Sequence, residues 1–323
     1  MLIVYLYVDD LIFTGNCDAM FKEFKKSMMD EFEMSDLGIM HYFLGIEVVQ
    51  SSDGIFISQK KYVGEILDRF QMKDCNPVNT LIEFGLKLHK DHEGKKVDSK
   101  LYKQIVGSLM YLTATRPDIM YSMSLINRYI ENPTKMHLLV AKRILRYLQG
   151  TRDFGLFYNK GEKSNVLGFT DSDYAGDQDD RRSTSGYAFM FGTGAISWSS
   201  KKQPIVILSS TEAKFVAATT CASQAIWPRR ILEELQFKQP GATKIFCDNN
   251  SAIKLSKNGR SKHIDVKFYF LRDLSNDGTI DLIYYRSEDQ VDDIFTKALK
   301  MESFVKLIRK LGICTLKTVK VLN

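Results

Sequence analysis

The chain has 323 residues and a net charge of +6, with 44% hydrophobic and 26% charged residues. This length predicts more than one domain, and the composition is that of a globular protein, which argues against a disordered chain. The positive charge favours an acidic partner such as nucleic acid, although an excess of lysine is often only a solvated surface.

Cysteine usage and the apolar start of the chain indicate its compartment. Five cysteines are scattered without a CxxC pair, which predicts free thiols in a reducing compartment and argues against a zinc site. Met1–Val8 is too short to span a bilayer before Asp9 and Asp10 interrupt it. We therefore expect an intracellular protein, cytoplasmic or nuclear, with no membrane partner.

The first sixty residues show strand and helix signals in alternation. MLIVYLYVDDLIFTG, residues Met1–Gly15, predicts a hairpin with Asp9 and Asp10 at its tip, although two Asp residues also simply make a good turn. The other elements predicted here are a helix over Ala19–Phe32 and a hairpin formed by His41–Gln50 and Ile55–Gln59.

A helical region follows. Its predicted helices cover Lys61–Phe70, Ser99–Ala114, Pro117–Ile130 and Pro133–Leu148, with prolines that suit first helical turns. Asn76–Lys96, which contains Pro, Gly and a run of charges, is the predicted linker, and Gly150–Ser164 is the predicted domain boundary.

Carboxylates follow several apolar runs in the second half. NVLGFTDSDYAG, residues Asn165–Gly176, ends in Asp171 and Asp173, whose spacing of two places them on one face of a strand. More acids occur in SSTEA (Ser209–Ala213), IFCDNNSA (Ile245–Ala252) and DQVDDIFTKAL (Asp289–Leu299). Separated carboxylates at the ends of such elements could converge on one metal site.

The order of elements in this half predicts its architecture. Strands are predicted over Val166–Asp171, Gly186–Phe191, Ala195–Ser199, Lys244–Asp248 and Ile280–Tyr285, and helices over Thr211–Leu235, Ser251–Lys257, His263–Asn276 and Gln290–Lys297. Three antiparallel strands followed by alternating helices and strands imply a mixed sheet covered by helices. The segment after Leu299 is basic and only weakly patterned.

These motifs, in this order, resemble a known family. TDSDYAGDQDDRRSTSGYAFMFGTGAISWSSKKQPIVILSSTEAKF, CDNNSAIKLSKN, SKHID and EDQVDDIFTKAL resemble the ribonuclease H region of copia-type retrotransposon Pol polyproteins. YVDDLIFTG, LGIMHYFLGIEV, VGSLMYLTATRPDI and AKRILRYLQGT are similar to the reverse transcriptase of the same polyprotein, from its third catalytic motif onward.

The resemblance implies an α/β fold: a mixed-sheet ribonuclease H-like domain preceded by a truncated polymerase palm and a helical thumb/connection region. The expected domains are a partial reverse transcriptase palm at 1–59, a thumb/connection-like helical region at 60–160, the ribonuclease H-like domain at 161–299 and a basic tail at 300–323.

The activity implied by the resemblance is a metal-dependent endonuclease that cleaves the RNA strand of RNA–DNA hybrids. The family motif assigns Asp171, Glu212, Asp248 and Asp293 as catalytic ligands of two Mg²⁺ ions, with Mn²⁺ as an alternative. Asp292 stands where the family usually has Ala, and the resemblance favours Asp293 over it. Each acid also has a structural role open to it, such as a capping-box role for Glu212.

Contacts with the hybrid are expected beside the acids, because cations and hydroxyls suit phosphates and 2′-OH groups. The predicted nucleic-acid-binding residues are Arg181, Arg182, Ser183, Lys201 and Lys202, with Trp198 nearby. A solvated hairpin is the alternative interpretation. His263 is expected to begin a helix rather than to assist the site.

Departures from the family pattern favour a second hypothesis, a catalytically inert hybrid-binding remnant of a decayed retroelement. Lys214 stands where the family usually has Glu, Pro228 interrupts a predicted helix, and the loop at Asn258–Arg260 is shortened. Asp9 and Asp10 form a polymerase remnant, and we expect no polymerase activity, because the fingers and the rest of the palm would have to come from another chain. The oligomeric state stays open.

Overall fold

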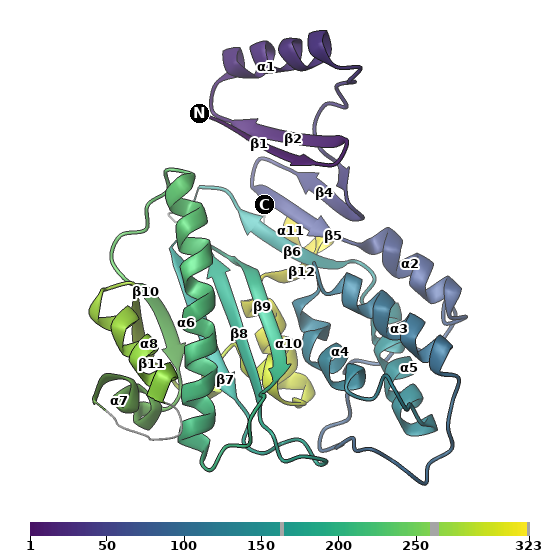
Figure 1. The fold of residues 1–323 in the computed structure, drawn as a ribbon. Helices are drawn as coiled ribbons and strands as arrows, with labels where there is room; N and C mark the ends of the chain where they lie inside the picture. The colour runs from purple at the N-terminus through teal and green to yellow at the C-terminus, as the bar shows by residue number, and fades with distance from the viewer. Residues whose placement is uncertain (162–164, 259–264, 322–323) are drawn as a thin grey trace.

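The computed structural model describes residues 1–161, 165–258 and 265–321. Over these residues the strands form a two-stranded sheet and two five-stranded sheets, with orders β11-β10-β7-β8-β9 and β12-β6-β5-β4-β3. Figure 1 shows the two-stranded sheet at the top, the first five-stranded sheet at the lower left and a group of helices at the lower right.

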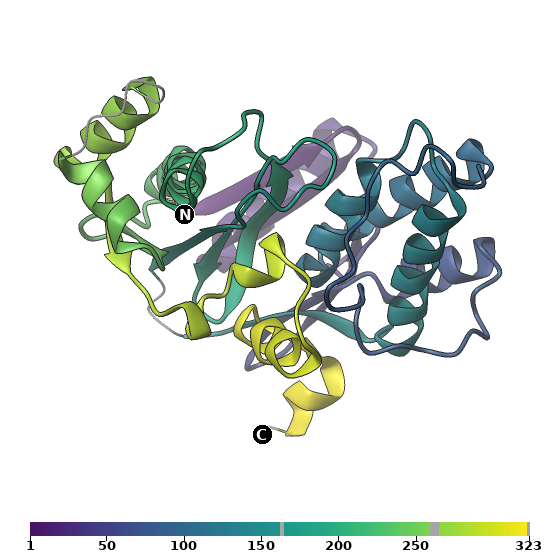
Figure 2. The same cartoon turned by 90° about the horizontal axis from the view of Figure 1, so that it is seen from below.

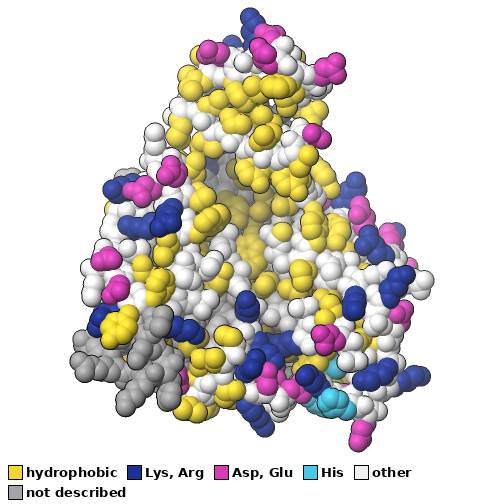
Figure 3. Space-filling view, viewed as in Figure 1, with side chains coloured by type: hydrophobic (Ala, Val, Ile, Leu, Met, Phe, Trp, Pro, Cys, Tyr) yellow, Lys and Arg dark blue, Asp and Glu magenta, His cyan; other side chains and the backbone are white. Residues whose placement is uncertain are grey.

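The amino-terminal unit is the predicted hairpin and helix. β1 (Leu2–Tyr7) pairs with β2 (Asp10–Gly15), and α1 (Asp18–Glu31) follows. Apolar side chains gather over this part of the surface (Figure 3), and Leu6 and Val8 are 66% and 76% exposed. Because α1 has no buried residue, this unit contributes little to the core.

The second five-stranded sheet joins distant parts of the chain. β3 (Tyr42–Phe43), β4 (Ile46–Gln50) and β5 (Gly54–Ser58) contain the predicted hairpin, and β6 (Phe154–Asn159) and β12 (Ile313–Thr315) complete the sheet. β6 lies inside the predicted boundary at Gly150–Ser164, so the sequence interpretation missed this strand. Its partner β5 is about a hundred residues away, and a local pattern does not report such a pairing.

The helical region follows the prediction closely. It contains α2 (Lys60–Arg69), α3 (Ser99–Leu112), η1 (Pro117–Ile119), α4 (Met120–Asn127) and α5 (Lys135–Gly150). Pro117 begins a 3₁₀ turn rather than an α-helix, and Pro133 lies outside α5, just before its Thr134 N-cap, so the predicted start of that helix is two residues too early. The side chain of Asp98 accepts a hydrogen bond from Lys100 N and caps α3.

The ribonuclease-like half forms the predicted mixed sheet. β7 (Val166–Ser172), β8 (Thr184–Phe191) and β9 (Gly194–Lys202) are antiparallel, while β10 (Thr243–Cys247) runs parallel to both β7 and β11 (Ile280–Tyr284). The helices here are α6 (Ser210–Glu234), α7 (Asn250–Asn258) and α8 (Asp265–Asn276).

Helices cover both faces of this sheet, as the view from below shows (Figure 2). On one face, Cys221 and Ala225 of α6 share a core with Phe189 and Ile245. On the other, one core joins the helical region to the sheet and to α9 (Asp293–Thr296). The domain boundaries at 59/60 and 160/161 stay predictions, and one core crosses the second of them.

The expected basic tail is a folded part of the molecule. Over the described residues, 300–321 contain α10 (Met301–Lys310), β12 and α11 (Leu316–Val321). Phe304, Leu307 and Ile308 of α10 are buried. The exposed Lys306 and Arg309 alternate with these apolar residues along α10, which is why the segment looked weakly patterned.

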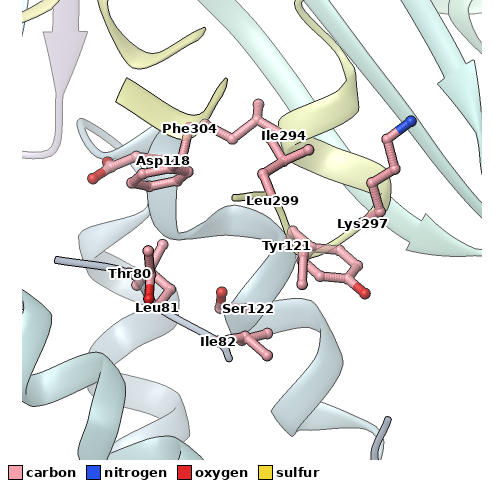
Figure 4. A pocket seen from close by; sticks show the side chains of 11 residues that line it. Thr80, Leu81, Ile82, Asp118, Tyr121, Ser122, Ile294, Lys297, Leu299 and Phe304 are labelled. Carbon is pink, nitrogen blue, oxygen red and sulfur yellow. The ribbon is translucent and has the colours of Figure 1, made fainter. Parts of the chain in front are cut away.

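A small cavity and the lengths of the helices complete the description of the fold. A cavity of about 20 Å³ lies between the helical region and α9–α10, with Tyr121, Ile294 and Lys297 in its lining (Figure 4); it has room for about one water molecule. No described helix is long and apolar enough to cross a membrane.

Candidate active site

Two of the predicted acids meet because their strands are parallel neighbours. Cys247 of β10 pairs with Thr170 of β7, so Asp248 and Asp171 occupy the next position at the same edge of the sheet. Adjacent strands lie ~4.8 Å apart. Both side chains are largely buried, at 2% and 7% exposure for Asp171 and Asp248.

An ammonium group lies between these two carboxylates. Lys214 Nζ is 3.0 Å from Asp171 Oδ1 and forms a second ion pair with Asp248 Oδ1. The lysine side chain is itself only 17% exposed. Lys214 was noted in the sequence as a departure from the family, but its position between the acids was not predicted.

The remaining carboxylate oxygens accept hydrogen bonds from hydroxyl groups. Thr296 Oγ1 donates to Asp171 Oδ2 at 2.8 Å, and Ser287 Oγ donates to Asp248 Oδ2 at 2.8 Å. The two acids are therefore held by side chains from α6, from the η2 turn (Ser287–Asp289) and from α9. The protein itself supplies their partners.

The electrostatics of the pair favour its charged state. Burial is the largest single influence and disfavours an ionised Asp171, but the Lys214 and Lys297 charges and the hydrogen bonds from Thr296 and Lys214 together hold the pKa of Asp171 below its ordinary value. Burial also opposes the charge on Lys214, while Asp171 and Asp248 raise the lysine pKa above its ordinary value. Lys214 and Asp171 are thus both charged at neutral pH.

Asp293 and Asp292 lie close to this pair but differ in exposure. Burial, followed by the charge of Asp171, raises the pKa of Asp293 to about 6, and Lys297 Nζ contacts Asp293 Oδ1 at 2.8 Å. Asp292 is fully buried, and burial raises the pKa of its carboxyl well above the usual range. The helix predicted over Gln290–Lys297 is only the single turn α9, so Asp293 stands at its first position.

Glu212, the fourth predicted ligand, is not brought to the other acids. Its Oε2 accepts a hydrogen bond from Leu208 N at 3.2 Å, and its own N–H donates to Ser209 Oγ at 3.2 Å. Residues two apart on a helix point about 200° apart. Since Lys214 faces Asp171, Glu212 must face away, and its side chain holds the start of α6 through Leu208 N, one residue before the Ser209 N-cap that a capping box would use.

The Mg²⁺ ions that the resemblance implies do not fit this arrangement. A cation already lies between Asp171 and Asp248, and the expected third carboxylate, Glu212, points elsewhere. Over residues 1–161, 165–258 and 265–321, no three His, Cys, Asp or Glu side chains are grouped to hold a metal ion. This geometry therefore supports no metal-dependent step.

Comparison with known proteins decides the family. Residues 1–84 match the family described as reverse transcriptase (RNA-dependent DNA polymerase). The chain is 39% identical over 316 residues to a retrovirus-related Pol polyprotein from transposon TNT 1-94 of Nicotiana tabacum, and 41% identical over 223 residues to an uncharacterized mitochondrial protein of Arabidopsis thaliana. The chain belongs to the copia-type retrotransposon Pol polyprotein family.

The matches cover different shares of the two relatives. The tobacco match covers 94% of this Pol chain but only 24% of the polyprotein, whereas the Arabidopsis match covers 69% of the chain and 92% of that protein. A foamy viral protease–reverse transcriptase in complex with double-stranded DNA has a similar structure, with a TM-score of 0.51 at 11% identity over 88% of this chain and 46% of that one. The predicted fold class is confirmed.

The predicted nucleic-acid-binding residues of this chain differ in their exposure and in their contacts within the protein. Arg181 and Lys201 are exposed. Lys202 instead contacts Asp177 at 3.2 Å and Asp180 at 2.8 Å. Arg182 lies 3.6 Å from Asp180 Oδ2.

Two other residues of this group have structural roles. Ser183 is buried, and its Oγ accepts a hydrogen bond from Ala175 N at 3.1 Å. Trp198 Nε1 donates to Thr113 O at 3.1 Å, so the indole lies against the end of α3. The loop between β7 and β8 is also held from outside, because Arg128 Nη1 contacts Asp177 Oδ2 at 3.1 Å.

The polymerase remnant lies far from this site. Asp9 and Asp10 are exposed at the tip of the β1–β2 hairpin, at the top of the molecule, whereas α6 begins near the bottom (Figure 1). His263 and the shortened loop at Gly259 lie outside the described residues.

Proposed function

We propose that this chain binds RNA–DNA hybrids through its ribonuclease H-like domain and does not cleave the RNA strand. The family supports the choice of ligand: a polymerase that copies RNA into DNA produces an RNA–DNA hybrid, and residues 1–84 match such a polymerase family. The similar foamy viral protein is described in complex with double-stranded DNA.

The observation that carries the non-cleaving part is the contact of Lys214 with both Asp171 and Asp248. Two-metal hydrolysis needs carboxylates that are available to bind divalent ions. Here one ammonium group neutralises part of the charge that would attract such ions, and Glu212 lies outside the cluster.

Two exposed cations near the sheet edge that carries the acids form the proposed hybrid-binding surface. Lys201 of β9 pairs with Ser185, which pairs with Ser172, the residue after Asp171. Because side chains alternate along a strand, Lys201 lies near the sheet edge that carries Asp171 but on the opposite face. Two strand spacings separate Lys201 from β7, or about 10 Å. Exposed Arg181 lies in the loop that follows β7, and both cations suit phosphate contacts.

The second candidate function is the metal-dependent RNA-strand cleavage that the sequence resemblance implies, with Mg²⁺ or Mn²⁺ as cofactor. The convergence of Asp171, Asp248 and Asp293 near one sheet edge favours it. It requires a divalent ion to displace Lys214 when the hybrid binds.

Two assays on the full chain separate these candidates. Fluorescence anisotropy with a labelled RNA–DNA hybrid measures binding, and gel analysis of the RNA strand in the presence of Mg²⁺ or Mn²⁺ measures cleavage. We expect salt-dependent binding without cleavage. Arg181→Ala with Lys201→Ala should weaken binding and lower the salt slope by about 2.

A matched control removes two exposed lysines from α1, Lys22→Ala with Lys26→Ala, and should leave the salt slope nearly unchanged. No salt-dependent affinity for the hybrid would refute the binding proposal. RNA cleavage that Asp171→Asn abolishes would establish the second candidate instead, and the same variant separates this activity from a contaminating nuclease.

A further inference from the structure

The edge formed by β7 and β10 has an electrostatic requirement of its own. Parallel pairing places Asp171 and Asp248 side by side in a largely buried position. Like charges that close repel strongly where water is excluded. A cation between them allows both carboxylates to stay ionised, whereas without one a buried carboxyl next to a like charge tends to bind a proton.

We propose that Lys214 is a built-in cation that replaces a divalent metal ion between Asp171 and Asp248, and that its exchange for a carboxylate opens a latent metal site. The geometry supports this assignment in three respects. The ammonium touches one oxygen of each acid, it projects from the helix packed across the two strands, and its side chain is largely shielded from solvent.

The surroundings of Lys214 strengthen the assignment. Thr296 and Ser287 hold the outer oxygens of Asp171 and Asp248, so the oxygens that face Lys214 are left for a cation. Asp293 interacts with Asp171 and is paired with Lys297. A carboxylate at position 214 would complete a set of hard oxygen ligands of the kind that Mg²⁺ and Mn²⁺ prefer.

The inference deepens the proposed function, and it rests on that function only in explaining why bound hybrid is not cleaved. Metal binding and thermal stability are measured without nucleic acid. If Lys214→Glu binds no Mn²⁺, the proposal that the chain binds hybrids is unaffected. If the chain does not bind hybrids, the metal measurements remain valid.

The experiment compares the full wild-type chain with Lys214→Glu. Isothermal titration with Mn²⁺ measures binding, and thermal melting is recorded in EDTA and in Mg²⁺. For wild type we expect no stoichiometric Mn²⁺ site and the same melting temperature, Tm, in both buffers. Lys214→Glu should melt earlier in EDTA, bind Mn²⁺, and recover roughly 5 °C in Tm when Mg²⁺ is about one hundred times Kd.

Two further variants make the outcome decisive. Lys254→Glu makes the same charge change at an exposed position of α7 and should show no Mg²⁺-dependent Tm. Lys214→Gln removes the ammonium without adding a ligand, and it should also lower Tm in EDTA, which keeps a test available if Lys214→Glu fails to fold. The proposal is overturned by a stoichiometric Mn²⁺ site in wild type, by an unchanged Tm of Lys214→Gln, or by a folded Lys214→Glu that binds no Mn²⁺.

Discussion

The side chains of Glu212 and Lys214 lie on opposite sides of α6 and have different roles. Glu212 accepts the Leu208 N–H and completes the cap formed with Ser209, while Lys214 reaches the acids. The two motif residues thus contribute to different properties, one to helix stability and one to the charge of the sheet edge.

Glu212→Ala is expected to lower the free energy of unfolding by about 1 kcal/mol, because a helix-capping interaction is lost. Urea denaturation measures the change. Glu234→Ala, at the exposed end of the same helix, is the control and should change stability by less than about 0.5 kcal/mol. Stability of Glu212→Ala equal to that of the control would contradict the capping role.

Asp173 gives the stability a dependence on pH. Burial raises its pKa to about 6, although the Thr184 N–H bond opposes this rise. The folded protein therefore binds the proton more tightly than the unfolded chain. The contribution of Asp173 is fully present below about pH 4 and is lost as the pH rises through about 6.

Asp173→Asn keeps an oxygen acceptor for Thr184 and removes the titration. Relative to wild type, its free energy of unfolding should rise between about pH 4 and pH 7, by roughly 1–3 kcal/mol. Urea denaturation of both proteins at several pH values measures this difference in the free energy of unfolding. Asp171 and Asp177 have lowered pKa values and contribute in the opposite direction. Because both proteins contain them, their contributions cancel in the difference. Parallel pH profiles would show that Asp173 does not titrate in this range.

At the scale of elements, α6 continues through a proline that the sequence marked as a conflict. The helix runs to Glu234 with Pro228 inside it and buried. The helix therefore does not end early. The proline destabilises it by removing one backbone hydrogen bond and by crowding the carbonyl four residues upstream. Packing against the sheet outweighs this local cost.

Pro228→Ala in the full chain should raise Tm by a few degrees, because a proline in a helix interior costs ~3 kcal/mol and only part of that is offset by lost contacts. Thermal melting measures the shift. Gln224→Ala alters the side chain, not the carbonyl, of the residue four positions upstream and serves as the control. A lower Tm for Pro228→Ala would mean that the packing of the proline ring outweighs its helix penalty.

At the scale of the whole molecule, the carboxyl-terminal segment holds distant parts together. β12 pairs with β6, with Ile313 opposite Leu156. α10 buries three apolar side chains in the core shared by the helical region and the sheet. Its lysines also reach back, since Lys306 and Lys310 both contact Asp289.

A chain ending at residue 299 should therefore unfold at markedly lower temperature and aggregate, because it exposes core residues and leaves β6 without one neighbour. Melting and size-exclusion chromatography measure both effects. A chain ending at residue 315 keeps α10 and β12 and is the matched control, expected to stay soluble. Equal stability of the chain ending at 299 would show that this segment is only a tail.

The amino-terminal hairpin leads to a prediction about polymerase activity. Asp9 and Asp10 are exposed at its tip, and among the described residues no third metal-ligating side chain is grouped with them. Two-metal phosphoryl transfer needs more ligands than these. The purified chain alone should not extend a primer on an RNA template, and extension that Asp9→Asn abolishes would disprove this.

The sequence by itself determined the local elements and the family. Period-two and period-3.6 patterns located the β1–β2 hairpin, the mixed-sheet strands and the long helix α6, because each pattern reflects one buried face. Motif order identified the Pol resemblance, and the strand ends carrying Asp171 and Asp248 were expected to converge, as they do in the structure.

Only the tertiary structure decided which side chains meet. β6 and β12 became strands through partners far away in sequence, and α10 became part of the core through contacts that local composition hides. At the site, residue spacing could not choose between Glu212 as a ligand and Glu212 as a cap. The rotation of α6 against β7 decided it, turning Lys214 toward the acids and Glu212 away, and a helix's rotation is set by its packing rather than by its own sequence.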